Sequence, residues 1–164
     1  MICITPLEKK DVSSIIAWNE GKGADFLTQW AGRGYRYPLM EEQITERLIP
    51  NPGTDFKIYG IILDGKILGT IELMKIDFVT KRASIGHFLV DPAETGKGYG
   101  TEALQLFVKN VFTELPVDTL ELNVFDFNRT AILCYQKVGF IKTGKVVRPN
   151  GWVAINMEIR RKDL

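Results

Sequence analysis

The segment from Arg82 to Ala103 constrains the fold more than any other part of the chain. It begins as an apolar strand, turns at Asp91-Pro92, and then places glycine at alternate positions, Gly96, Gly98 and Gly100. Apolar residues at helical spacing follow at once. A glycine-rich turn that opens a helix presents unpaired backbone N–H groups and the positive end of the helix dipole to one point. Because such a point binds phosphate, the segment predicts a phosphate-bearing ligand.

Size and composition describe one globular domain that spans residues 1–164. Lys plus Arg number 21 against 20 for Asp plus Glu, which removes the electrostatic case for nucleic-acid binding. No run approaches the ~18 apolar residues of a membrane span, so no membrane partner is expected. The N-terminus lacks the features of a signal peptide. With 2 cysteines and 1 histidine the sequence predicts a reduced, cytoplasmic protein without a metal site.

Hydrophobic periodicity predicts a chain that mixes strands and helices. Strands are expected over residues 56–63, 66–74, 82–90, 119–125, 140–147 and 152–160. Helices are expected around 12–16, 40–48, 101–115 and 130–138, with Asp11 as an N-cap, whereas residues 21–38 form a glycine- and aromatic-rich segment. Short hairpins make most strands antiparallel, but the strand that ends at Val90 reaches the next one through a helix. These two strands should therefore be parallel, with the ligand beyond their carboxyl ends.

Two common phosphate-binding motifs fit the glycines poorly. A P-loop needs Gly-Lys followed by Ser or Thr, but Gly96-Lys97 is followed by Gly98. A Rossmann fingerprint can be written as Gly98, Gly100 and Ala103, yet residues 91–97 separate it from the strand. Antiparallel strands upstream are also wrong for that fold.

A third pattern fits better. The stretch FLVDPAETGKGYGTEAL resembles the cofactor motif of the GNAT-type N-acetyltransferase family, whose usual Arg or Gln falls here on Thr95. About thirty residues later, NRTAILCYQKVGF resembles the second signature of that family, met by Asn128, Ala131, Tyr135, Gly139 and Phe140. The order of predicted elements also matches, so the resemblance covers essentially the whole chain. It is strongest to the bacterial Rim-type branch, which includes acetyltransferases for ribosomal-protein N-termini.

The resemblance implies a mixed, mostly antiparallel sheet of about seven strands with one splayed parallel pair and helices on both faces. It implies acetyl transfer from acetyl-CoA to a primary amine, either a small molecule or a peptide N-terminus, by direct attack. A homodimer is compatible with it. A non-catalytic acyl-CoA-binding module is the alternative, motivated by Thr95. Lys97 is expected to compensate in part for the missing Arg. The positions expected to contact the cofactor are Phe88, Leu89, Val90, Thr95, Gly96, Lys97, Gly98, Tyr99, Gly100, Thr101, Asn128 and Tyr135.

The resemblance implies that Tyr135 is the general acid. A phenol of pKa ~10 can protonate a leaving thiolate whose conjugate acid has a pKa of ~8.5. Asn128 either bonds the cofactor or caps its helix, and Cys134 is expected to be a small buried filler. The base is open between Glu72, His87 and a water chain to bulk solvent. Glu72 lies mid-strand, where burial would raise its pKa, and His87 is expected to share a strand face with Ile85 and Leu89.

The resemblance implies that the acceptor binds near the segment 21–38, because this region borders the acceptor cleft in the family. Trp30, Tyr35 and Tyr37 are the expected contacts, in company with Arg33 and Arg36. Aromatic rings with two arginines can receive an acceptor that bears a negative group. Anchoring of the loop is an equally valid interpretation of the same residues.

Overall fold

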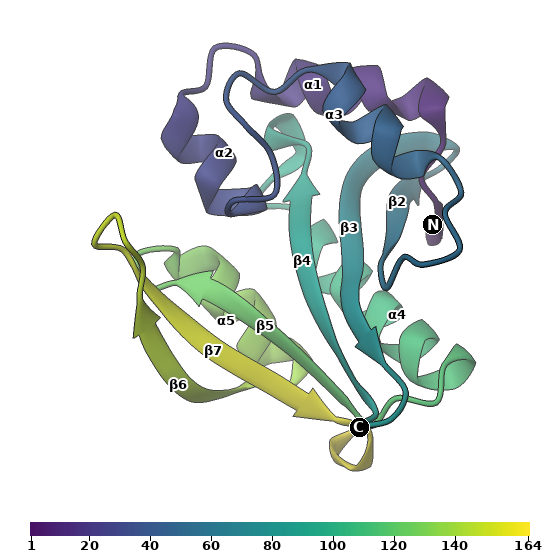
Figure 1. Cartoon of the computed structure of the whole chain (residues 1–164), viewed down its shortest axis with the longest axis vertical. Helices are drawn as coiled ribbons and strands as arrows, with labels where there is room; N and C mark the ends of the chain where they lie inside the picture. Colours follow the sequence, from purple (N-terminus) through teal and green to yellow (C-terminus); the bar gives the residue numbers. More distant parts are fainter.

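A computed structural model describes all residues, 1–164. Seven strands form one sheet in the order β1-β2-β3-β4-β5-β7-β6 (Figure 1). Their bounds are β1 Ile2–Pro6, β2 Lys57–Leu63, β3 Lys66–Asp77, β4 Arg82–Val90, β5 Thr119–Phe125, β6 Ile141–Val147 and β7 Val153–Arg160. All neighbouring pairs are antiparallel except β4 and β5, which are parallel, as predicted. β1 is the strand for which periodicity gave no signal, because it has five residues and ends in proline.

Five α-helices accompany the sheet: α1 Val12–Asn19, α2 Ala24–Ala31, α3 Glu41–Thr45, α4 Tyr99–Glu114 and α5 Arg129–Val138. Short 3₁₀ turns lie at Lys9–Asp11, Glu46–Leu48, Pro92–Glu94 and Arg161–Asp163. Helix α2 falls in the glycine- and aromatic-rich segment 21–38, for which no helix was predicted, and it buries Leu27 and Ala31 one turn apart. Asp11 precedes α1, but its side chain makes no capping hydrogen bond. None of the helices combines the length and apolarity needed to cross a bilayer.

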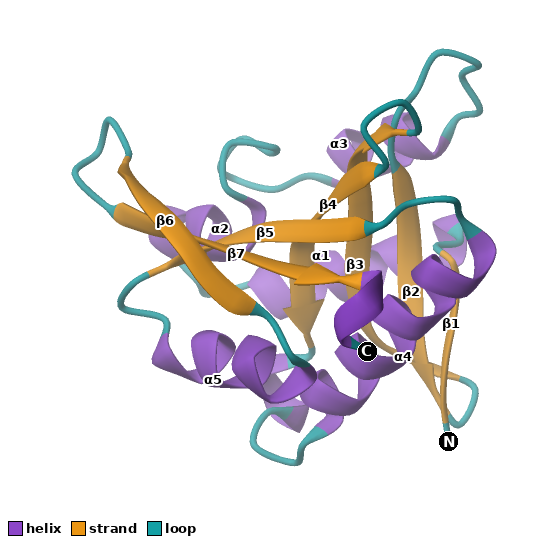
Figure 2. Ribbon diagram, turned by 90° about the horizontal axis from the view of Figure 1, so that it is seen from below, coloured by secondary structure: helices purple, strands orange, loops and turns teal.

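The sheet separates two apolar cores. The larger core packs one face of the sheet against α4 and α5, and includes Leu104, Phe107 and Phe140. The smaller core lies beneath α1, α2 and α3, around Ile15, Leu27 and Ile44. Figures 1 and 2 show α4 and α5 on the opposite side of the sheet from α1–α3. Helices therefore cover both faces, which confirms the predicted layering.

The parallel pair separates soon after it begins. β4 and β5 pair at Arg82–Thr119, Ala83–Leu120 and Ser84–Glu121, and no pairing follows beyond Ser84. Figure 1 shows the two strands together near the C-terminus and apart at their far ends. The remaining backbone of β4, up to Val90, therefore faces a gap rather than a neighbouring strand. The expected splay is present.

A bulge in β4 changes which side chains face the gap. Glu72 of β3 pairs with Gly86 and Thr70 with Leu89, so β4 carries one extra residue between these positions. His87 adopts a φ of 46°, in the left-handed region that non-glycine residues rarely occupy. As a result Ile85 joins the core beneath α4, whereas His87 turns to the other face, beside Glu72. The expectation that His87 and Ile85 share a face was wrong for this reason.

Arg161 fastens the C-terminal end of α4 to the last strand. Its guanidinium donates to the carbonyl oxygens of Phe112, of Leu115 at 2.9 Å and of Val117 at 2.5 Å. It also lies over the Phe112 ring, 5.2 Å from the centroid. A cation that bonds the final carbonyls of a helix satisfies acceptors that the helix cannot satisfy itself.

We therefore expect Arg161→Ala to lower the free energy of unfolding by about 1.5–3 kcal/mol, the range for lost hydrogen bonds to a charged donor. Urea denaturation followed by circular dichroism measures the change. The exposed neighbour Lys162 makes no such contacts, so Lys162→Ala should stay within about 0.5 kcal/mol of the parent. Equal effects of the two substitutions would contradict the role given to Arg161.

Candidate active site

The glycine turn has the geometry of an anion cradle. Gly96 and Gly98 have φ values of 82° and 83°, in the left-handed region that glycine adopts without strain. Gly98 immediately precedes α4, whose first turn has N–H groups that no carbonyl of the helix can reach. Both glycines are exposed, and a Cβ at either position would meet nothing within 4 Å. Backbone conformation, rather than crowding, is what requires glycine here.

Two side chains of the turn are engaged locally. The Thr95 hydroxyl donates to the Pro92 carbonyl at 3.0 Å. The Lys97 ammonium lies 2.6 Å from the Glu94 carboxylate, which raises the pKa of Lys97 and neutralises its charge. The expectation that Lys97 replaces the missing arginine is therefore weakened, and the backbone amides remain the main donors of the turn.

Tyr135 lies where α5 faces the splayed strands. Its ring packs beside Phe88 of β4 and Phe140, with centroids 6.4 and 5.9 Å away. Burial raises the pKa of the phenol. The hydroxyl makes no hydrogen bond to a protein group. It is free to donate a proton to a group that enters the gap.

Neighbours of Tyr135 on α5 have structural contacts. The side chain of Asn128 accepts a hydrogen bond from the Ala131 amide at 3.3 Å, so it caps α5. Cys134 is half-buried, with its sulfur 3.4 Å from the Thr101 hydroxyl. Burial raises the pKa of this thiol, which agrees with a filler rather than a nucleophile.

On the other face of β4, Glu72 and His87 meet in a cluster with a residue that the sequence analysis missed. Arg47 donates from both terminal nitrogens to the Glu72 carboxylate, and its Nη1 lies 2.9 Å from both Glu72 Oε2 and the Tyr35 hydroxyl. The guanidinium also stacks on Phe56, 4.4 Å from the ring centroid. Arg47 lies in a short 3₁₀ turn far along the chain, so no motif could have indicated it.

This cluster reverses the expected pKa of Glu72. Burial alone would raise that pKa, but the close approach of the His87 ring and the hydrogen bonds from Arg47 outweigh it and hold the pKa of Glu72 below its usual range. His87 Nδ1 is 2.9 Å from Glu72 Oε2, although the approach is off the ring N–H direction and leaves Nδ1 without an aligned hydrogen bond. The other edge of the ring is pressed against Gly34, where a Cβ would lie 2.3 Å from Cε1 and Nε2.

A groove of about 1180 Å³ opens in front of the splayed strands. Residues of α2 and the following loop form one wall, and β4, β5 and the β6–β7 turn form the other. Trp30 lines this groove, while its indole N–H donates to Asn19 at 2.9 Å and so anchors α2 to α1. His87 also lines it. The groove is large enough to receive an acceptor.

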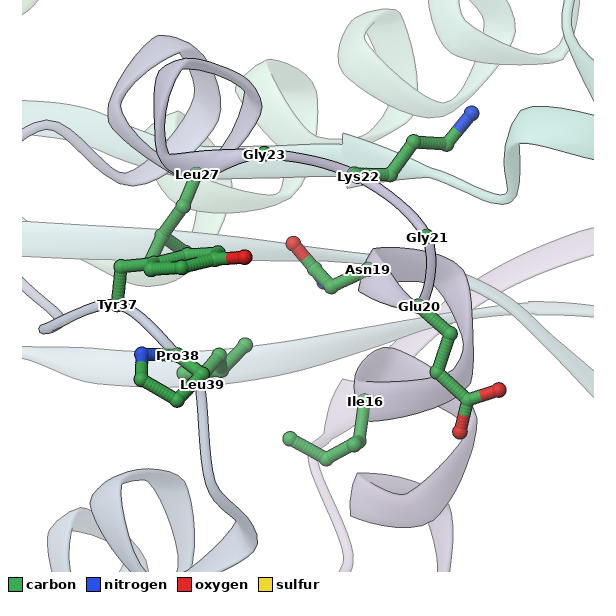
Figure 3. Close-up of a pocket in the computed structure, with 10 residues that line it drawn as sticks. All are labelled: Ile16, Asn19, Glu20, Gly21, Lys22, Gly23, Leu27, Tyr37, Pro38 and Leu39. Atoms are coloured by element: carbon green, nitrogen blue, oxygen red, sulfur yellow. The ribbon is translucent and has the colours of Figure 1, made fainter.

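Only two of the three aromatic residues expected at the acceptor site, Trp30 and Tyr35, come together. Tyr35 packs against Trp30 and His87, with centroids 5.9 and 5.0 Å away, and is turned toward Arg47. Tyr37 instead lines a separate small pocket of about 200 Å³ with Leu27 and Asn19 (Figure 3). Of the expected contacts, only Trp30 faces the groove.

Comparison with known proteins now decides the family. Residues 24–140 match the profile of the Acetyltransferase (GNAT) family. The chain belongs to the GNAT family. It is 32% identical over 161 residues to the "Probable N-acetyltransferase YjcK" of Bacillus subtilis, which covers 92% of this chain and 87% of that protein.

Two polyamine enzymes are also similar. The spermidine N(1)-acetyltransferase of Escherichia coli K12 is 26% identical over 144 residues, 88% of this chain and 75% of that one. The crystal structure of spermidine N-acetyltransferase from Vibrio cholerae in complex with CoA and spermine superposes with a TM-score of 0.83 at 18% identity, covering 99% and 96% of the two chains. The superposition on the Vibrio cholerae structure establishes the fold.

As a GNAT acetyltransferase the enzyme uses acetyl-CoA as its acetyl donor. The residues at the glycine turn fit this cofactor, because left-handed glycines and free helix amides suit a pyrophosphate. No cluster of three or more His, Cys, Asp and Glu side chains has the arrangement of a metal site.

The buried pair predicts how stability depends on pH. The depressed pKa of Glu72 contributes stability above its unfolded pKa of about 4.3, and this is lost as the pH falls through the lower folded pKa. Arg47→Met leaves the carboxylate buried without its main partner, so at pH 7 we expect a loss of about 3–5 kcal/mol in unfolding free energy.

That deficit should shrink below about pH 5, because protonated Glu72 needs no cation. Urea titrations between pH 4 and pH 8 measure it. Adding Glu72→Gln to Arg47→Met removes the buried charge and should restore much of the lost stability. A deficit that stays the same across this pH range would contradict the account.

Proposed function

We propose that this enzyme moves the acetyl group of acetyl-CoA to a primary amine by direct attack. The observation that carries the proposal is the gap between β4 and β5. On one side of it lies the phenol of Tyr135, and on the other the groove that reaches His87. A thioester held in the gap would thus face an acid on one side and an incoming amine on the other.

The backbone is proposed to hold the cofactor. Amides at Gly96, Gly98 and Gly100 would bind the pyrophosphate, with Tyr99 and Thr101 in the same turn. The unpaired edge of β4 at Phe88, Leu89 and Val90 would bond the pantetheine arm. The side chains of Thr95 and Lys97 would contribute less, since both are engaged within the loop.

Tyr135 is proposed as the general acid. Breaking the C–S bond leaves a thiolate that must take up a proton, and the unpaired phenol supports this role. Because burial raises its pKa, the phenol stays protonated throughout the neutral range. Asn128 would act through the position of α5, which it caps.

Proton removal from the amine is proposed to involve His87 or a water chain rather than Glu72. The carboxylate of Glu72 is held by Arg47 and has a lowered pKa, so it accepts a proton weakly. His87 lines the groove, and its Nδ1 lies 2.9 Å from the Glu72 carboxylate. Glu72 then acts as a positioning residue.

Three broader expectations complete the proposal. The sequence as a whole looks most similar to the Rim-type branch, which includes acetyltransferases for ribosomal-protein N-termini. Neutral overall charge and few cysteines support a cytoplasmic location. A homodimer remains a prediction.

Replacing Tyr135 by Phe tests the mechanism. A screen of amines and peptide N-termini, monitored by released thiol, supplies the acceptor. Tyr135→Phe should then lower kcat ~10²–10⁴-fold, the usual contribution of a positioned general acid. Acetyl-CoA affinity, measured by calorimetry, should hardly change because the ring is kept.

Tyr59→Phe is the matched control. Tyr59 is half-buried against Phe107 of the main core, away from the gap, and its substitution should leave turnover unchanged. Undiminished turnover in Tyr135→Phe would mean that the thiolate leaves unaided or is protonated elsewhere. Absence of thiol release with every acceptor would favour the non-catalytic acyl-CoA-binding module.

A further inference from the structure

The groove in front of the splayed strands is positively charged. Four cationic side chains line it, Arg33, Lys75, Arg82 and Arg148, against two carboxylates, Glu121 and Glu158. A groove for a polyamine would be expected to have the opposite balance, because a cationic acceptor is attracted and oriented by carboxylates.

Both carboxylates are already neutralised. Arg82 reaches Glu121 at 2.9 Å and Glu158 at 3.0 Å. Glu158 also accepts a second contact from Arg160 at 3.3 Å. The nearby Glu72 is held by Arg47. The groove therefore has no free carboxylate with which to bind a cation.

The other three cations have no acidic partner. Arg33 and Lys75 are exposed and Arg148 is half-buried, and none of them takes part in an ion pair. They come from three separate elements: the loop after α2, the end of β3, and the turn between β6 and β7. Each lines the same groove as His87 and Trp30. Their charges therefore act on whatever occupies the space next to the reacting amine.

We propose that the acceptor is a primary amine that also bears an anionic group, a carboxylate or phosphate, and that polycations are poor acceptors. This inference rests on the proposed function, because it names the substrate class of the same site. The free guanidinium groups of Arg33 and Arg148 are the donors suited to bidentate binding of an oxyanion. The similarity to spermidine acetyltransferases thus extends to the fold and not to the acceptor.

Matched acceptors test the charge preference. Three C-terminally amidated tripeptides with a free N-terminus, Ala-Asp-Ala, Ala-Asn-Ala and Ala-Lys-Ala, differ only in the charge of one side chain. Spermidine serves as the polycationic acceptor. Comparing phosphoethanolamine with ethanolamine shows whether a phosphate, rather than a carboxylate, is the preferred anionic group. We expect kcat/KM for Ala-Asp-Ala to exceed that for Ala-Lys-Ala about tenfold or more, as for a site that pairs a charged group. The ratio should fall as KCl rises from about 0.05 to about 0.5 M.

Charge-reversal variants of the groove provide a second test of the proposal. Arg33→Glu and Arg148→Glu should each raise KM for the acidic acceptor several-fold and lower it for spermidine, while acetyl-CoA affinity stays at the parent value. Lys109→Glu, on the exposed face of α4, is the control and should leave KM for both acceptors unchanged. If no tripeptide is turned over, calorimetric binding of the same peptides in the presence of CoA replaces the kinetic comparison.

The outcomes separate the two claims. Faster transfer to spermidine or Ala-Lys-Ala, or a preference that survives both reversals, overturns the anionic acceptor while leaving acetyl transfer intact. Equal or absent binding of all three peptides overturns it as well. A protein that neither binds acetyl-CoA nor releases thiol refutes the proposed function itself.

Discussion

The pairing of β4 with β5 ends after three residue pairs, and the active site depends on this interruption. A strand edge without a neighbour leaves backbone donors and acceptors unsatisfied, which favours an extended ligand that can pair with them. The bulge at His87 turns the imidazole toward the groove. The glycine turn follows β4 at the open end, so one continuous segment supplies the edge, the base candidate and the anion cradle.

The two faces of the sheet have different electrostatic character near the gap. On the face of α4 and α5, Tyr135 packs between Phe88 and Phe140, and burial raises the pKa of its phenol. On the other face, the ion pair of Arg47 with Glu72 fixes a buried negative charge beside His87. The phenol of Tyr135 and the imidazole of His87 thereby lie on opposite faces of the sheet. Such a separation of titratable groups is typical of active sites.

Local patterns predicted much of the fold. Six strands, the helix after the glycine turn and the helix of Tyr135 were evident because alternation and turn residues are local properties. Helix α2 was missed because glycines flank its short apolar stripe. The expected direction of the pKa shift of Glu72 was wrong, because Arg47, which lowers this pKa, approaches from a 3₁₀ turn that is distant in sequence. Trp30 and Tyr37 belong to the same glycine- and aromatic-rich segment but line different pockets, which no periodicity could predict.

The central claim is that the open edge of β4 and the glycine turn hold acetyl-CoA through backbone amides. Amide hydrogen exchange by NMR, with and without saturating acetyl-CoA, tests it directly. We expect slower exchange at Phe88–Val90 and Gly96–Thr101 in the parent enzyme, and no such change in Gly98→Asp, where bulk and negative charge oppose the pyrophosphate. Unchanged exchange at these amides, or protection confined to the groove residues Arg33 and Arg148, would contradict the account.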